Sequence, residues 1–397
     1  MIDGTILKFN IILFLRALML LSPVLLFFYQ ENGLTKSDLF LFQGVFYAAS
    51  ILFDFPVGYF ANIFSRKHII LFAFFLFFIV SALWILFKGY YIVLAGEIIF
   101  ALTKTIIDNV PSAYLYDYLK IRQKNMVTHW GYSNFYISAG TAVGAVVGAY
   151  LYKMYGSAFV LKTECVLIAV GIYLISTLPN ITSEHKREET IKNKIKAYME
   201  TTVKIYKKEA LRYYIIYSGI FASCSALFAL FFQPLMKDAA FPVVMFGVVS
   251  FLNHFIRSCA GFITGKWLSN VRIKRFIIPL FILYLCAFGA IFVIFENKNI
   301  VLDFCLIATI CLIIGVQLSF LILHISRLHR FVPFEQRGTL MAVNNCTARL
   351  ISAAVLMLSG FFTRYLDLKE FFTIVFPVFI IFGSYFMIKT YQVKEDA

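Results

Sequence analysis

The stretch from Asp54 to Phe87 reads DFPVGYFANIFSRKHIILFAFFLFFIVSALWILF. Its second part, residues 69–87, contains no charged side chain. This part is long enough to cross a bilayer core, which needs about 20 apolar residues in a helix. A polar break with two basic residues, Arg66 and Lys67, separates it from an earlier apolar run. The pattern predicts two consecutive membrane helices joined by a basic loop.

The composition of the whole chain agrees with this interpretation. Of its 397 residues, 61% are hydrophobic and only 14% are charged, and the mean hydropathy is +0.83. Soluble domains carry roughly 25% charged residues, so an ordinary globular protein is excluded. We predict an integral membrane protein whose helix surfaces face the lipid bilayer.

The same hydropathy window predicts twelve membrane helices. Their expected spans are 6–28, 39–62, 69–87, 91–117, 129–152, 157–178, 213–235, 241–266, 276–295, 300–326, 338–363 and 369–390. The sequence thus predicts an all-α membrane protein with an N-terminal six-helix bundle (1–178), a cytoplasmic linker (179–212) and a C-terminal six-helix bundle (213–397). Within the linker, residues 183–199 alternate apolar and charged residues at helical spacing, which predicts an amphipathic helix on the inner membrane face.

The charge distribution predicts the orientation of the chain. The formal net charge is +15, from 36 basic and 21 acidic residues. If both termini are cytoplasmic, by far the larger share of the basic residues lies on the cytoplasmic side, as the positive-inside rule requires. This topology accounts for the charge, so no nucleic-acid partner is expected.

The seven cysteines lie in apolar stretches without metal-ligand spacing, and we predict no metal and no cofactor.

The basic loop resembles the G-x-x-x-D-x-x-G-R-K signature of the major facilitator superfamily. The matching positions are Gly58, Arg66 and Lys67. Asn62 stands where the family has Asp, and Ser65 where it has Gly, which weakens the charge relay attributed to this motif. A degenerate echo at residues 261–266 occupies the equivalent place in the second half, as the internal duplication of this fold predicts.

Other short motifs resemble the macrolide-exporter-like branch of bacterial efflux proteins in this family. They are Arg16 and Pro23 in helix 1, the turn Gly33-Leu34-Thr35, Gly96-Glu97 and Tyr116-Asp117-Tyr118-Leu119 in helix 4, and Pro333, Arg337 and Thr339 at helix 11. The resemblance implies a monomeric exporter in the bacterial cytoplasmic (inner) membrane. We assign gating to Gly58, Asn62, Arg66, Lys67, Asp117 and Arg337, with a structural cap as the alternative role for Asp117.

Helix 5 carries a glycine at every fourth position, namely Gly140, Gly144 and Gly148. This spacing lets another helix approach closely. It resembles the glycine-rich motif of proton-coupled antiporters, although Ala145 replaces the proline of that motif. Helix packing is the favoured interpretation.

Ionisable groups inside the membrane are the main functional candidates, because each costs roughly 2.5–3.5 kcal/mol on insertion scales. Those of the first half are Arg16, Asp54, Glu97, Lys104, Asp108 and Glu164. Lys104 and Asp108 are four residues apart and therefore share one helix face. In the family's arrangement Arg16, Lys104 and Asp108 would face a central cavity; the alternative is an ion pair that joins helices 1 and 4. For proton coupling we predict Asp108, then Glu97 and Asp54, with a gate pair between Asp54 and Arg337 as an alternative.

The membrane charges of the second half are basic. Arg257 and Arg349 would favour an anionic substrate, unless backbone carbonyls or carboxylates across the bundle interface neutralise them. Additional hydrogen-bonding candidates for the substrate are Gln233, Gln317, Asn344 and Asn345.

These features favour a secondary active transporter. The cargo would be a small molecule or small peptide, and a proton is the expected coupling ion. The branch resemblance implies export of a toxic compound or antibiotic, such as an anionic peptide or a nucleotide-like molecule, and nutrient uptake by symport is the alternative. A membrane-embedded enzyme, a receptor or a channel is less favoured. For the enzyme, the sequence lacks GxSxG, HExxH and Walker motifs.

Overall fold

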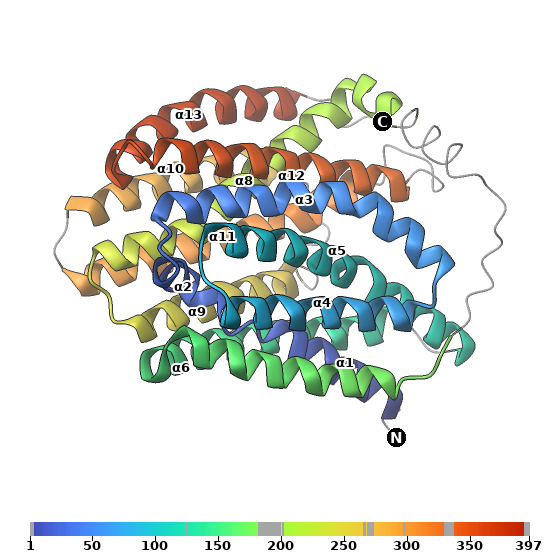
Figure 1. Ribbon diagram of the computed structural model, residues 1–397. Helices are drawn as coiled ribbons and strands as arrows, with labels where there is room; N and C mark the ends of the chain where they lie inside the picture. Colours follow the sequence, from blue (N-terminus) through green and yellow to red (C-terminus); the bar gives the residue numbers. More distant parts are fainter. Residues whose placement is uncertain are drawn as a thin grey trace. The chain divides into compact units, whose positions relative to one another are not determined.

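The structure is a computed structural model, and it describes residues 4–123, 126–181, 200, 202–264, 267, 274–296, 299–328 and 337–392 (Figure 1). All the regular elements in these residues are helices. The prediction of an all-α membrane fold is therefore confirmed. The linker helix predicted at 183–199 lies outside the described residues.

Contacts between Cα atoms divide the chain into two compact units. The first unit comprises Met1–Lys186 and Ala240–His254, and the second comprises Arg187–Ala239 and Phe255–Ala397. The helices of the first unit are α1 (Gly4–Ala17), η1 (Ser22–Val24), α2 (Leu25–Glu31), α3 (Lys36–Ile63), α4 (Arg66–Leu86), α5 (Tyr90–Ile121) and α6 (Met126–Ser176), to which the first part of α9 (Val243–Ile263) is added. Those of the second are α8 (Glu209–Asp238), the rest of α9, α10 (Lys274–Glu296), α11 (Ile300–Leu328), α12 (Arg337–Phe362) and α13 (Leu368–Gln392).

Within the described residues, eleven helical segments are long and apolar enough to cross a membrane. One of them, His129–Ser176, is 48 residues long and covers two predicted spans, 129–152 and 157–178. Gly156 separates these spans with φ 77° and ψ 178°, a backbone conformation that is not helical and that glycine adopts without steric cost. The eleven segments thus account for the twelve predicted membrane helices.

The predicted first helix is interrupted. The sequence predicts one helix over residues 6–28, but α1 ends at Ala17 and η1 begins at Ser22. Met19 has a positive φ of 32° between them. Pro23, at the start of η1, lacks the N–H that a continuous helix would need. We call residues 18–21 the helix 1 break.

The turn into α3 follows directly from its sequence. Gly33 has φ 76°, a left-handed conformation that ends the preceding helix. Thr35 then caps α3: its Oγ1 accepts from the backbone N–H of Asp38 at 3.3 Å, and the Asp38 carboxylate accepts from the Thr35 N–H at 2.8 Å. This capping box fixes where α3 begins.

Each unit has its own apolar interior. In the first unit, α1 packs along α6, and α4 packs against both α5 and α6, as Figure 1 shows. Phe9 and Tyr114 stack there with ring centroids 5.6 Å apart. In the second unit, α8 packs on α12 and α13. Its core is rich in aromatic side chains, including Phe228, Phe288 and Phe372, which contact one another.

Candidate functional site

Helix α5 carries the predicted ion pair of the first unit. The Lys104 ammonium lies 2.5 Å and 2.6 Å from the two carboxylate oxygens of Asp108. These side chains remain 41% and 36% exposed, so the pair lies on the surface of its unit and not in its core. Next to it, the Asn109 amide donates to Asp54 of α3 at 3.4 Å. We call the exposed Lys104–Asp108 pair and the neighbouring Asn109, which reaches Asp54, the polar surface of the first unit.

Arg16 of α1 is enclosed in the same unit. It is 4% exposed, and its guanidinium carbon lies 4.6 Å from the Phe77 ring centroid and 5.2 Å from that of Phe100. Its Nε and Nη2 atoms have no hydrogen-bond partner among the described residues. The charges of Asp108 and Glu164 act on it electrostatically. Arg16 is therefore a buried cation held by aromatic faces and by two carboxylates at longer range.

Glu97 of α5 lies in a buried polar cluster. Its side chain is 2% exposed. The Tyr29 hydroxyl donates to its Oε1 at 2.7 Å, and the Gln43 amide donates to its Oε2 at 3.2 Å. Its neighbour Gly96 leaves room for Trp84, because a Cβ there would lie 2.1 Å from the indole nitrogen. Within the described part of the chain, both partners of this carboxyl are neutral.

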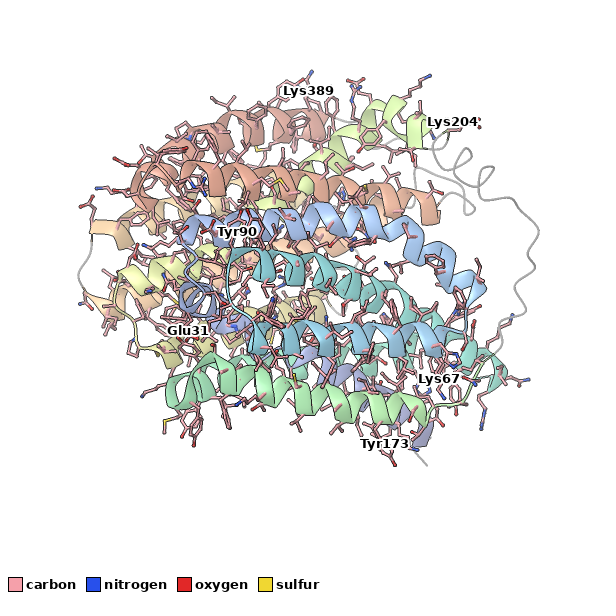
Figure 2. All side chains as sticks on the ribbon, in the orientation of Figure 1. Glu31, Lys67, Tyr90, Tyr173, Lys204 and Lys389 are labelled. Atoms are coloured by element: carbon pink, nitrogen blue, oxygen red, sulfur yellow. The ribbon has the colours of Figure 1, made fainter. Side chains whose placement is uncertain are left out.

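The two basic residues of the predicted loop, Arg66 and Lys67, form the start of α4 and contact α5 and the end of α6. Arg66 forms an ion pair with Asp117 at 2.5 Å and also donates to the Ala113 carbonyl oxygen of α5. Lys67 donates to the carbonyl oxygens of Ser176, the last residue of α6, at 2.7 Å, and of Leu178, just beyond it, at 2.6 Å. Figure 2 shows Lys67 at the same end of the unit as Tyr173 of α6, opposite Glu31. Asp117 of α5 therefore forms an ion pair with the first residue of α4. Its role in gating stays a prediction.

The three other gating candidates, Gly58, Asn62 and Arg337, have less structural support. Gly58 is exposed, and a Cβ there would meet open space. The side chains of Asn62 and Arg337 lie outside the described residues, so the pairing of Asp54 with Arg337 stays a prediction.

The three glycines of α6 face the first membrane helix: Gly140 faces α1, and Gly144 and Gly148 face the helix 1 break. A Cβ at Gly140 would lie 2.5 Å from the Phe14 carbonyl oxygen. At Gly144 it would lie 1.5 Å from the Leu18 oxygen, and at Gly148 it would lie 1.9 Å from the Leu20 oxygen. Main chain packs directly on main chain here, which only glycine permits.

The candidates of the second half fall into two groups. Gln317 and Asn344 are buried and form interhelical hydrogen bonds: Gln317 accepts from Tyr284 of α10, and Asn344 accepts from Ser218 of α8 at 3.1 Å. The half-buried or exposed candidates are Gln233, Arg257, Asn345 and Arg349. The burial of the first group favours a role in joining helices, and their proposed contact with substrate stays a prediction.

Glu164 of α6 is an intramembrane carboxyl to which the sequence assigns no role. Its carboxylate accepts the backbone N–H of Leu21, at the helix 1 break, with a distance of 2.9 Å. The only feature of the sequence that points to Glu164 is its position as a glutamate in an apolar helix. Its partner, Leu21, could not be predicted, because it lies 143 residues earlier in the chain.

Comparison with known proteins identifies the family. The Major Facilitator Superfamily model matches residues 9–357, nearly the whole chain. The chain belongs to the major facilitator superfamily. No curated protein matches the sequence. The efflux branch suggested by the short motifs thus stays a prediction for this major facilitator superfamily protein.

Solved structures of superfamily members share its fold at low sequence identity. The crystal structure of the nucleoside transporter NupG has a TM-score of 0.81 and 13% identity, and the match covers 99% of this chain and 100% of that one. A D-xylose-proton symporter has a TM-score of 0.75 and 14% identity, covering 98% and 97%. The POT family transporter PepTSo has a TM-score of 0.72 and 13% identity, also covering 98% and 97%. Family and fold establish a multi-pass membrane transporter.

The Arg66–Asp117 pair gives a first testable prediction. Asp117→Ala should strongly lower the stability of the folded protein, because it leaves the buried Arg66 cation without its carboxylate. Breaking a buried ion pair in this way costs about 3–5 kcal/mol. We expect less folded protein in the membrane and a lower thermal unfolding temperature by fluorescence.

The charge swap Arg66→Asp with Asp117→Arg is the control, since it restores opposite charges at the same two positions. It should recover part of the lost thermal stability. If Asp117→Ala unfolds at the wild-type temperature, the ion pair does not stabilise this end of the unit.

Proposed function

We propose that the protein is a proton-coupled secondary transporter that moves a small molecule across the bacterial cytoplasmic membrane by alternating access. The observation that carries this proposal is the buried Glu97 carboxyl, bonded only to neutral donors among the described residues. A coupling group must bind a proton in one conformation and release it in another, and a carboxyl whose contact with water changes between conformations does this.

The polar surface beside Glu97 supports a water-accessible path on the same helix. Lys104 and Asp108 are exposed at mid-span, where contact with hydrocarbon would cost roughly 2.5–3.5 kcal/mol per charge. The surface that carries them therefore faces water or substrate and not lipid. Of the three predicted coupling residues, Glu97 is the most enclosed. We therefore propose Glu97 as the first candidate for the coupling residue, followed by Asp108 and Asp54.

The direction of transport has two candidates. Export of a toxic compound or antibiotic is proposed from the motifs that resemble the efflux branch, and Arg257 and Arg349 favour an anionic cargo. Proton-driven uptake is the second candidate, because a nucleoside transporter and a D-xylose-proton symporter are among the structures with this fold.

We also propose that the protein is a monomer. The distribution of basic residues supports the proposal that both termini lie in the cytoplasm.

Proteoliposomes with an imposed pH gradient test this function. Purified protein is reconstituted, and a pH-sensitive dye inside the vesicles reports proton movement when nucleosides, sugars or antibiotics are added. We expect that one class of compound causes proton movement and accumulates in the vesicles under one direction of the pH gradient. If the flux of every class is the same with and without the pH gradient, the proposal of proton coupling is wrong.

The Asp108→Asn variant separates the two leading coupling candidates. An exposed ion pair is worth about 0–1 kcal/mol, so its loss should change apparent substrate affinity by no more than roughly fivefold. We expect proton-driven accumulation in vesicles to continue. Complete loss of accumulation with retained substrate binding would instead make Asp108 the coupling residue, as the sequence alone suggested.

A further inference from the structure

The helix 1 break leaves backbone groups that must find partners inside the membrane. Hydrocarbon offers no hydrogen bonds, so free N–H groups there are costly. Ser22 N–H bonds to the Met19 oxygen at 3.1 Å, and Val24 N–H bonds to the Leu21 oxygen at 3.0 Å. The N–H of Leu21 instead donates to a side chain, Oε1 of Glu164, at 2.9 Å. One carboxylate thus supplies a side-chain acceptor to the backbone of the break.

Glu164 reaches the break from the second membrane span of α6 and is only 5% exposed. The first span of the same helix supplies Gly144 and Gly148, on which the carbonyl oxygens of Leu18 and Leu20 rest. The break is therefore held by close backbone packing on the first span of α6 and by a charge-assisted hydrogen bond from the second span. Met19, with φ 32°, is in a conformation that only surrounding contacts maintain.

The charged groups around Glu164 are few. Among the residues that the structure describes, Arg16 on α1 acts on its charge, and Cys165, beside it on α6, is influenced by it in turn. Arg16 responds to Asp108 as well, which is paired with Lys104 on the polar surface. Arg16 is therefore the charged group that faces Glu164 from α1 among the described residues.

We propose that Glu164 controls the conformation of the helix 1 break through a proton-dependent hydrogen bond to Leu21. With Glu164 ionised, the bond holds residues 18–21 as they are in this structure. When a proton from water binds a carboxyl oxygen, the acceptor becomes neutral, and charge-assisted hydrogen bonds are about twice as strong as neutral ones. The weaker bond lets the break open. This inference rests on the proposed proton-coupled transport and adds a residue and a moving element to it.

Hydrogen–deuterium exchange of the full-length protein in lipid nanodiscs tests the proposal. The measured segment is residues 18–24, and exchange is followed at several pH values and corrected for the intrinsic pH dependence with an unstructured reference peptide. In the wild type, we expect exchange of this segment to be faster at acidic pH by on the order of tenfold. Glu164→Gln should exchange fast at every pH.

Glu31→Gln is the matched control. Glu31 joins α2 to α6 in a similar way, through Tyr152 at 2.7 Å and through Ser157, but its side chain is exposed at the end of α2. This variant should keep the wild-type pH profile. If Glu164→Gln does not fold, the pH profile of the wild type decides alone.

A corrected exchange rate that does not change with pH would overturn the proposal, as would a Glu164→Gln profile identical to that of the wild type. The measurement needs neither substrate nor gradient. If reconstituted vesicles show no proton-coupled transport, the proposed function is wrong, but a pH-dependent exchange rate would still support the role of Glu164. A flat exchange profile would refute the role of Glu164 and leave proton-coupled transport intact.

Discussion

Vesicles that contain the Glu97→Gln variant are expected to lose proton-driven accumulation of substrate while keeping exchange of substrate across the membrane. The amide has the shape of the carboxyl but binds no proton at neutral pH. Its oxygen still accepts from Tyr29, and the Gln43 amide turns so that its own oxygen accepts the new N–H. The fold therefore persists while the coupling site is lost.

The size of the effect follows from coupling energetics. Coupling free energies between two bound species are typically about 1–3 kcal/mol, which corresponds to roughly 5- to 150-fold in affinity. We expect accumulation ratios to fall by a factor in this range, measured with a fixed inward or outward pH gradient. Counterflow of labelled against unlabelled substrate, which needs no net proton movement, should stay close to the wild-type rate.

Glu31→Gln provides the control for this experiment too. Glu31 accepts a tyrosine hydroxyl at 2.7 Å, the same bond length as at Glu97, but it is exposed and not buried. Its variant should accumulate substrate normally. Equal losses in both variants would show that the removal of any such carboxylate damages the protein, and normal accumulation by Glu97→Gln would exclude Glu97 as the coupling residue.

Gly144→Ala should destabilise the protein more than any conservative substitution elsewhere on α6. The new Cβ would lie 1.5 Å from the Leu18 carbonyl oxygen, and that oxygen belongs to backbone that cannot rotate away as a side chain would. Overpacking typically costs about 1–3 kcal/mol and occasionally more. We expect a markedly lower thermal unfolding temperature of the purified protein and a smaller monodisperse fraction on size-exclusion chromatography.

Gly131→Ala on the same helix is the matched control, because a Cβ there meets nothing within 4 Å. Alanine is favoured over glycine in a helix interior by about 0.8–1.0 kcal/mol, so this variant should be as stable as the wild type or more stable. If the two variants unfold at the same temperature, α6 does not pack on the helix 1 break as closely as described.

Much of the fold could be predicted from residues that act locally. The apolar run at residues 69–87 corresponds to α4, Arg66–Leu86, and the long polar segment after residue 178 separates the two sets of membrane spans. These features depend on hydropathy averaged over about 20 residues, which can be calculated directly from the sequence. Lys104 and Asp108 were predicted to pair because the helical period alone places them on one face, and the structure contains that pair.

The interruption of helix 1 could not be read in the same way. Residues 18–21 are apolar, so hydropathy continues through them, and a window measures composition and not backbone conformation. Pro23 was a signal, but proline also occurs in continuous membrane helices such as α3 and α5.

The sequence by itself determined the class of protein, the approximate membrane spans and the polar residues inside them, since each of these follows from local composition and period. Tertiary structure alone decided which of those residues meet. Glu164 and Leu21 are 143 positions apart, and Tyr29 and Glu97 are 68 apart, so their hydrogen bonds exist only because packed helices bring them together. The environment of a buried charge depends on such distant neighbours, and that environment separates enclosed Glu97 and Glu164 from the exposed pair of Lys104 and Asp108.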